Sequence, residues 1–206
     1  MIKSVDNIGL ILLAAGASGR LGKPKQSLQF EGETLLRRAV KSAIASDCQS
    51  VIVVLGANAE KLELEIEEFD AHIIKNPDWE RGMGTSIQIG LEELLKRQPK
   101  ISGVILAVCD QPFVSVGLLK QLTENFRLTN APIIACAYGE TLGVPTLFSR
   151  NLFSELLTLK ADNGAKKIIY KHREKVIKIP FEAGALDIDT EQDYLNLIES
   201  DKFTAS

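Results

Sequence analysis

The sequence predicts an α/β protein in which helices cover both faces of a mostly parallel sheet. Three continuous apolar runs, at 8–13, 51–55 and 104–108, are typical of strands that are buried on both faces. Segments with apolar residues at helical spacing separate these runs, and this alternation is the pattern of a parallel sheet. We expect a single domain over residues 1–206, because a chain of that length can bury a large core.

The first half of the chain alternates strands and helices. Thr34 is expected to cap a helix whose apolar residues run from 35 to 44. A second helix is predicted over 58–69, and a short strand over 71–75. A glycine-rich loop then leads to a helix that starts at Thr85-Ser86.

The second half has a similar mixture of elements. Ser115 is expected to cap a helix that runs through Phe126. Thr190 is expected to cap the last helix, with Asp193 in the role of the capping-box carboxylate. A further helix is predicted over 152–159. The remaining apolar runs predict strands at 132–137, 144–148, 176–179 and about 185–188.

Composition and charge exclude several classes of function. The formal net charge of -3 gives no electrostatic basis for binding nucleic acid or an anionic membrane. No apolar run approaches the ~20 residues of a membrane-spanning helix, and the first residues lack a signal-peptide pattern. Cys48, Cys109 and Cys136 are odd in number and far apart, which favours reduced thiols in a cytoplasmic protein.

The strongest functional signal is the segment 12–26, which leaves the first predicted strand. It combines glycines with cationic side chains: Gly16, Gly19, Gly22, Arg20, Lys23 and Lys25. Glycine tolerates positive φ and carries no side chain, so such a loop can point several backbone N–H groups at one anion. The segment therefore predicts a polyphosphate-binding loop.

Other glycine-rich loops fit this segment less well. A Walker-type loop ends in Gly-Lys-Ser/Thr, whereas Pro24 follows Gly22-Lys23 here and brings neither a hydroxyl nor an N–H group. A dinucleotide-binding loop has the spacing G-x-G-x-x-G and opens directly into a helix. The spacing Gly16-x-x-Gly19-x-x-Gly22 before a proline disfavours that loop and a Rossmann dehydrogenase with it. A tight turn with solvated charges is the remaining alternative.

A second glycine-rich loop, 76–86, ends at a predicted helix start. Backbone N–H groups and hydroxyls at that point lie at the positive end of the helix dipole, which favours an anionic ligand. Taken alone, the segment fits an ordinary loop and N-cap better than a ligand-binding loop. Trp79 in this loop is expected to pack against the protein and not to stack on a base.

Asp110 follows the buried strand predicted at 104–108. In open α/β sheets, ligands bind at the carboxyl ends of the strands. A carboxylate at such a place suits Mg²⁺, which proteins hold with one or two carboxylates together with substrate phosphate oxygens. The alternative is that Asp110 is a turn residue or helix cap before Pro112.

The first loop closely resembles the signature of the MobA-like nucleotidyltransferases, L-A-x-G-x-S-x-R-M-G-x-x-K. Residues 13–22 match it with Leu21 in place of Met, and Lys25 takes the lysine position. Ala15 gives the form L-A-A-G, which looks like the molybdenum cofactor cytidylyltransferase branch of the family. Two further segments resemble family motifs: Cys109-Asp110-Gln111-Pro112 and Asp187-Ile188-Asp189-Thr190.

The resemblance implies roles for individual residues. Arg20, Lys25 and Asp110 would be the catalytic residues. Mg²⁺ would be held by Asp110 together with Asp187 or Asp189. The nucleotide would be bound by Leu13, Ala14, Ala15, Gly16, Ser18, Gly19, Gly22, Gly82, Gly84, Thr85 and Ser86.

The resemblance also implies a Rossmann-like three-layer α/β/α fold of the nucleotidyltransferase type. Residues from about 1 to 112 would form the nucleotide-binding half, and those from about 113 to 206 the acceptor-binding half. The expected activity is Mg²⁺-dependent transfer of a nucleotidyl group, with CMP from CTP favoured, onto the phosphate of molybdopterin with release of pyrophosphate. A molybdoenzyme or a chaperone would be a transient partner.

Some positions depart from the family pattern. Val144, Ala161 and Lys166 stand where the family has His, Gly and Arg, and all three lie in the half expected to hold the acceptor. The departures bear on the acceptor more than on the reaction class. The alternatives are therefore a nucleotidyltransferase for another phosphorylated acceptor, such as a sugar or polyol phosphate, and a non-catalytic nucleotide-binding protein.

Overall fold

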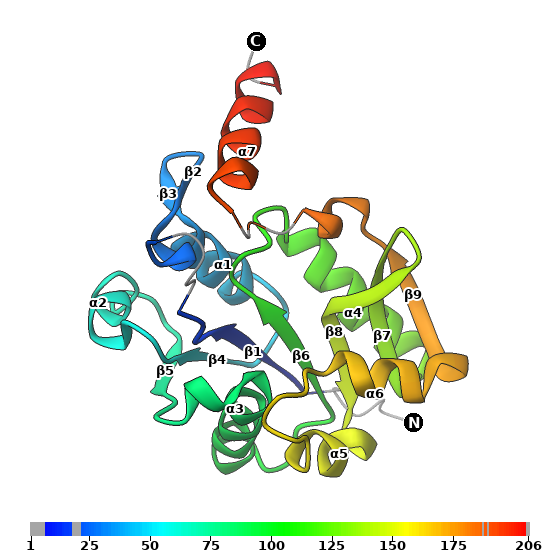
Figure 1. Ribbon diagram of the computed structural model, residues 1–206. Coiled ribbons are helices and arrows are strands. Elements are labelled where there is room, and N and C mark those ends of the chain that lie inside the picture. The colour runs from blue at the N-terminus through cyan, green and yellow to red at the C-terminus, as the bar shows by residue number, and fades with distance from the viewer. Residues whose placement is uncertain (1–6, 18–21, 187, 189, 205–206) are drawn as a thin grey trace.

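A seven-stranded sheet forms the centre of the molecule (Figure 1). The computed structural model describes residues 7–17, 22–186, 188 and 190–204. The spatial order of the strands is β5-β4-β1-β6-β8-β7-β9. Their bounds are β1 Ile8–Ala14, β4 Ser50–Leu55, β5 His72–Lys75, β6 Gly103–Val108, β7 Ile133–Tyr138, β8 Thr141–Ser149 and β9 Val176–Pro180.

The sheet is mostly parallel, as the sequence predicts. β8 runs antiparallel to β6 and β7, and the other neighbouring pairs described for this seven-stranded sheet are parallel. β1 lies between β4 and β6, with Leu13 opposite both Val54 and Val108. Because parallel strands end at the same edge, the loops that follow β1, β4 and β6 meet there.

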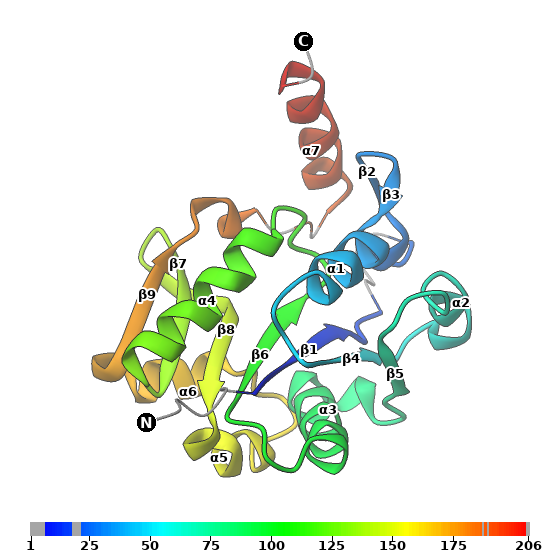
Figure 2. The same cartoon turned by 180° about the vertical axis from the view of Figure 1, so that it is seen from behind.

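Helices cover both faces of this sheet, which gives the three predicted layers (Figures 1 and 2). α1, α2 and α4 pack on one face, and α3, α5 and α6 on the other. None of the described helices combines the length and the apolar composition that crossing a membrane requires. Their bounds are α1 Leu35–Ile44, α2 Ala59–Leu64, α3 Met83–Arg97, α4 Val116–Thr129, α5 Phe153–Leu157, α6 Lys166–Lys171 and α7 Glu191–Thr204.

The core has one layer of apolar side chains on each face of the sheet. In β1, Leu10 and Leu12 join the cluster beneath α1 and α4, whereas Ile11 and Leu13 join the cluster beneath α3. This alternation follows from the two-residue period of a strand. Every residue of β1 is buried, which explains why the run looks uniformly apolar in the sequence.

The sequence signals at three helix starts are confirmed. Thr34 Oγ1 accepts the N–H of the third residue after it at 3.3 Å, and Ser115 Oγ does the same at 3.2 Å. Thr190 and Asp193 form a reciprocal capping box, in which each backbone N–H donates to the side chain of the other residue. These bonds are local, so sequence spacing alone is enough to predict them.

The strand predicted at about 185–188 is wrong. The chain forms a 3₁₀ helix over Glu182–Ala185 and is irregular afterwards at Leu186 and Ile188. Ile188 is buried in a small cluster with Phe30, whereas Leu186 is 55% exposed. The apolar run therefore marks a chain that docks through one side chain and pairs with no described strand.

Two predicted helices are shorter than expected. α2 ends at Leu64, although the turns that follow still bury Ile66, and the helix predicted over 152–159 is a 3₁₀ turn followed by α5. A two-residue hairpin, β2 Gln29–Phe30 with β3 Glu33–Thr34, was not predicted. Its turn residues, Glu31 and Gly32, have φ of 49° and 80°, which suits the right-handed twist of paired strands.

We predict that α3 owes much of its attachment to the sheet to its buried leucines. Leu91 is fully buried, so Leu91→Ala should lower the free energy of unfolding by about 2–5 kcal/mol. Leu128→Ala is the matched control, because this helical leucine on α4 is 77% exposed and should cost less than about 0.5 kcal/mol. Urea denaturation measures both, and equal midpoints would contradict the packing described here.

Candidate active site

The carboxyl ends of β1 and β6 border a pocket of about 440 Å³. Its walls come from the loop after β1, the 3₁₀ helix η1 (Lys25–Ser27), the segment that leads into α3, and the end of β6. The loop and the end of β6 are about 95 residues apart in the sequence. The parallel pairing of β1 with β6 brings them to one edge of the sheet.

Three consecutive side chains of η1 reach three different parts of the molecule. Lys25 Nζ lies 3.4 Å from Asp110 Oδ2, across the pocket from the end of β1. Gln26 Nε2 donates to the carbonyls of Ala14 and Gly16 at 2.9 and 2.8 Å. Ser27 Oγ donates to a carboxylate oxygen of Glu65 at 2.7 Å, so η1 is also tied to the chain after α2.

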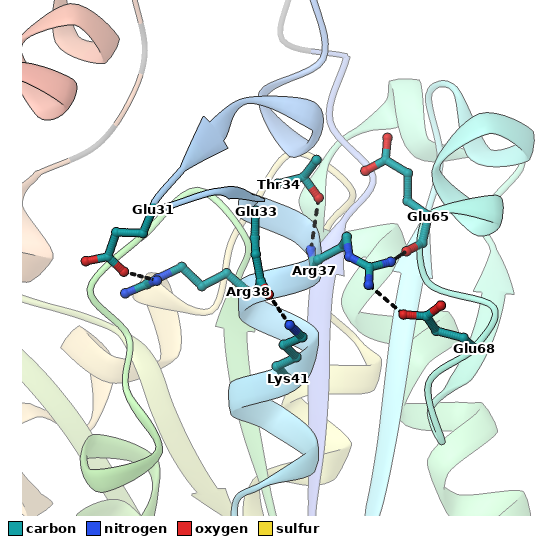
Figure 3. Close-up of polar contacts among 8 residues, drawn as sticks. All are labelled: Glu31, Glu33, Thr34, Arg37, Arg38, Lys41, Glu65 and Glu68. Carbon is teal, nitrogen blue, oxygen red and sulfur yellow. Dashed lines mark hydrogen bonds and ion pairs between the residues drawn. The ribbon is translucent and has the colours of Figure 1, made fainter.

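Two neighbouring arginines on α1 hold the surrounding chain segments (Figure 3). Arg37 points toward the chain after α2, where its guanidinium donates to the Glu65 carbonyl at 2.6 Å and to the Glu68 carboxylate at 2.5 Å. Arg38 points the other way, pairs with Glu31 in the hairpin turn, and donates to the Pro112 carbonyl at 2.9 Å. α1 thus contacts the chain after α2 through Arg37, and the hairpin turn and Pro112 through Arg38.

Asp110 sits in a turn that two hydrogen bonds hold on its C-terminal side. Besides the bond from α1 to Pro112, the amide of Gln111 donates to the Gly184 carbonyl at 3.2 Å. Burial raises the pKa of the neighbouring Cys109 thiol, and the Asp110 carboxylate adds to this rise. The thiol therefore stays neutral near pH 7, and Asp110 supplies the negative charge at this wall.

The wall opposite is built around the buried side chain of Asn76. Its amide donates to the hydroxyls of Thr85 and Ser86, each at 2.9 Å, and its carbonyl accepts the N–H of Asp78 at 2.9 Å. Thr85 Oγ1 donates onward to the Gly82 carbonyl at 2.8 Å. Asn76 therefore sets the conformation of the whole segment that leads into α3.

Gly82 and Gly84 allow a close approach between this segment and the second half of the chain. A Cβ on either residue would lie 2.3 Å from a carbonyl oxygen of Lys160 or Ala161. The N–H of Gly84 donates to the Ala161 carbonyl at 2.9 Å. Gly82 also has a φ of 122°, which other residues rarely adopt.

Most of the predicted site residues that the structure describes lie together at the pocket. The predicted residues that line the pocket are Leu13, Ala14, Ala15, Gly16, Lys25, Gly82, Ser86 and Asp110. Gly22, Gly84 and Thr85 do not line it; the first is exposed, and the other two contact protein groups. Ser18, Gly19, Arg20, Asp187 and Asp189 lie outside the described residues.

Sequence reasoning missed several residues of the pocket. Gln26, Glu80 and Met83 line it, and Asn76, to which no role is assigned from the sequence, holds its wall. Trp79 lines the pocket and also touches the protein, since a Cβ on Gly56 would lie 2.6 Å from the Trp79 Cβ. These contacts join segments far apart in the sequence, so no local pattern reveals them.

The described part of the chain contains no cluster of three or more His, Cys, Asp or Glu side chains that could enclose a metal by itself. A single carboxylate in an open pocket still fits a hard divalent cation, because Mg²⁺ keeps water and substrate phosphates as its other ligands. Asp110 is 29% exposed and beside the pocket, so its donor chemistry matches such an ion.

Comparison with known proteins gives a family match. A family model described as "MobA-like NTP transferase domain" matches residues 10–176. The chain is 35% identical over 118 residues to the nicotine blue oxidoreductase of Paenarthrobacter nicotinovorans, an alignment that covers 57% of this chain and 56% of that protein. It is 24% identical over 193 residues to the molybdenum cofactor cytidylyltransferase of Escherichia coli, which covers 93% and 96% of the two chains.

Solved structures show the same fold. Rv0371c from Mycobacterium tuberculosis superposes with a TM-score of 0.83 at 29% identity, covering 95% of this chain and 99% of that chain. A structure of Rv0371c in complex with manganese superposes with a TM-score of 0.78 at 27% identity, covering 94% and 99%. A divalent metal is thus documented in a relative of this fold.

We predict that the buried amide of Asn76 stabilises the pocket wall. Asn76→Ala would remove the donor to the hydroxyls of Thr85 and buried Ser86 and the acceptor of the Asp78 N–H, at a cost of about 1–3 kcal/mol in the free energy of unfolding. Asn125→Ala removes an amide that bonds to one carbonyl within the exposed face of α4, and should cost less than about 1 kcal/mol. Urea denaturation measures the free energy of unfolding of both variants. A smaller loss for Asn76→Ala than for Asn125→Ala would refute this role.

Proposed function

The chain belongs to the MobA-like NTP transferase family, and from this premise we propose that it is a nucleotidyltransferase for a phosphorylated acceptor. CTP is the favoured donor and molybdopterin the favoured acceptor. The observation that carries the proposal is the pocket in which Lys25 and Asp110 face each other beside the glycine-containing loop after β1.

In the proposed reaction, an oxygen of the acceptor phosphate attacks the α-phosphorus of the nucleoside triphosphate. The bond between the α-phosphorus and the bridging oxygen breaks, and pyrophosphate leaves with the electron pair. The second pKa of a phosphate monoester is ~6, so the attacking group is already an anion at pH 7 and needs little help from a general base. The barrier is therefore mainly electrostatic, because two anions must approach each other.

The chain's own residues supply positive charge and orientation for this step. The ammonium of Lys25 is positioned at the pocket by its pairing with Asp110 and can stabilise the departing pyrophosphate. Backbone N–H groups of the loop after β1 would hold the β- and γ-phosphates, as in other phosphate-binding loops. Arg20, from the same loop, is proposed to add a second cation.

Asp110 would hold Mg²⁺, together with Asp187 or Asp189. When bound, such an ion supplies positive charge that draws the donor and acceptor phosphate oxygens together. The manganese complex of Rv0371c supports a divalent metal at this fold, and Mg²⁺ is our choice because it is the usual partner of triphosphates in cells.

The preference for CTP rests on Ala15 and on the cytidylyltransferase among the relatives. The relatives also include proteins named for other activities, such as the purine catabolism protein PucB of Bacillus subtilis, so the acceptor needs a direct test. The wild-type protein with Mg²⁺ is combined with each of CTP, GTP, ATP and UTP and with phosphorylated acceptors, including molybdopterin and sugar and polyol phosphates. Pyrophosphate release is the readout.

We expect release with CTP and molybdopterin above every other pair. Release with a sugar or polyol phosphate instead would retain the reaction class and replace the acceptor. No release with any pair would refute the proposed activity. In that case NADH fluorescence titration tests a dehydrogenase, since one relative is named an oxidoreductase.

We predict that Asp110→Asn abolishes turnover and leaves the fold intact. The amide keeps the shape of the side chain but loses the charge that would hold the metal, so kcat should fall by at least about 10²-fold. Asp162→Asn, at an exposed residue outside the pocket lining, is the control and should keep full activity. Near-normal kcat of Asp110→Asn at saturating Mg²⁺ would rule out the metal assignment.

A further inference from the structure

Gln26 forms an amide clamp on the loop after β1. Its side chain is buried, with 2% of its surface exposed, and it lines the pocket. Nε2 donates to the carbonyl of Ala14 at 2.9 Å and to that of Gly16 at 2.8 Å, so both amide protons are used on one short stretch of backbone. Two carbonyl acceptors also identify this end of the amide as nitrogen.

The clamp fixes the direction of the loop's N–H groups. In a trans peptide the carbonyl of one residue and the N–H of the next point in opposite directions. Carbonyls of Ala14 and Gly16 turned toward Gln26 therefore turn the N–H groups of Ala15 and Ala17 away from it. The carbonyl between them, on Ala15, accepts the N–H of Ala57 at 3.0 Å, so the N–H of Gly16 points away from Ala57.

The carbonyls of Ala14, Ala15 and Gly16 thus all accept hydrogen bonds from other parts of the protein, whereas some N–H groups of the loop do not donate one to a described residue. The N–H groups of Gly16 and Ala17 form no hydrogen bond with any residue that the structure describes. Both residues line the pocket. A row of backbone donors with its carbonyls fixed elsewhere is the arrangement that binds an anion, because no partial negative charge can turn toward the ligand.

The other end of the amide argues against a purely stabilising role. Gln26 Oε1 is buried and has no hydrogen-bond partner among the described residues. A buried acceptor without a partner destabilises the fold, so a side chain chosen for stability alone would be paired at both ends. The unpaired Oε1 is therefore the counterpart of an Nε2 group that donates both of its protons to the loop.

We propose that Gln26 is a positioning residue, whose amide clamp on Ala14 and Gly16 keeps the loop in the conformation that binds the triphosphate. This inference rests on the proposed function. Gln26 forms no bond in the reaction and acts through the backbone donors of Gly16 and Ala17. Its loss should therefore weaken nucleotide binding and slow turnover, out of proportion to its effect on stability.

The chain offers a matched control in Gln88 of α3. Its Nε2 also donates to two carbonyls two residues apart, those of Leu157 and Leu159, at 2.9 and 3.0 Å. Gln88 does not line the pocket. The same substitution at Gln88 thus removes an identical clamp without touching the loop after β1.

We predict the effect of replacing each clamp with Met or Glu. Gln26→Met removes the donor at nearly constant volume, and kcat/KM for the nucleotide should fall by about 10²-fold, the typical effect of one lost backbone-type donor. Gln88→Met should change kcat/KM by less than about twofold. Thermal unfolding without ligand should give similar shifts for the two variants, whereas stabilisation by added CTP and Mg²⁺ should be lost in Gln26→Met alone.

Gln26→Glu adds a readout that a structural role would not move. An ionised carboxylate would place its oxygens against two carbonyl oxygens, whereas the protonated acid regains one donor. This environment raises the pKa of the introduced carboxyl, because it favours the neutral form. The ratio of Gln26→Glu to wild-type kcat/KM should therefore rise as the pH falls from about 8 to about 5.5, and the ratio for Gln88→Glu should stay flat.

Equal losses at Gln26 and Gln88, or an unchanged kcat/KM in Gln26→Met, would overturn the inference. Failure of the proposed function would look different, because the wild type itself would then release no pyrophosphate. If the wild type binds CTP without turnover, the Kd of CTP for the same four variants decides the role of Gln26. If the wild type binds no nucleotide at all, both proposals fall.

Discussion

The pairing of Lys25 with Asp110 is the contact on which the site depends. The two charged atoms lie 3.4 Å apart, and both side chains are largely removed from solvent, with 16% and 29% of their surfaces exposed. A charged side chain that is largely removed from water is stabilised by a partner of opposite charge or by a ligand, because an unpaired charge there raises the free energy of the folded state. In the proposed function, a cation would replace the ammonium at Asp110, and a phosphate would replace the carboxylate at Lys25.

The pair is held in place by residues that do not line the pocket themselves. Ser27 fastens η1 to Glu65, and Arg37 fastens the Glu65 backbone to α1. Arg38, one residue further along α1, fastens the turn after Asp110 through the Pro112 carbonyl. α1 is thus connected by hydrogen bonds to the segments that carry both members of the pair. A shift of α1 would move them together, so the distance between them is protected.

The sequence could predict the parts of this structure whose causes are local. Buried parallel strands are continuous apolar runs, and the caps at Thr34 and Ser115 bond to residues three positions on, so both leave a pattern. The site's first loop was found because glycines and cations cluster within it. The run at 185–188 misled because apolar composition cannot distinguish a strand from a chain that buries Ile188 alone.

The supporting residues could not be predicted, because their partners are distant in sequence and ordinary in type. Gln26 and Asn76 carry no charge, belong to no spacing rule and act through single amides on backbone or hydroxyls. Likewise, the need for glycine at Gly84 comes from Lys160 and Ala161, more than seventy residues away. Sequence patterns reveal what a segment can bind, whereas tertiary packing decides what holds it in place.

The second half of the chain also contributes to the pocket wall. The wall at Gly82 and Gly84 is not built by the first half alone, since Ala161 accepts the N–H of Gly84 and lies against Gly82. Ala161 and Val144 are positions where this chain departs from the family pattern, and Val144 packs against the core beneath α3, α5 and α6. In the proposed nucleotidyltransferase, changes in the second half would reach the pocket wall through this backbone contact and leave the loop after β1 and Asp110 in place. A reaction class fixed at one edge of the sheet can in this way be combined with different acceptors, which is why fold likeness alone does not identify the acceptor.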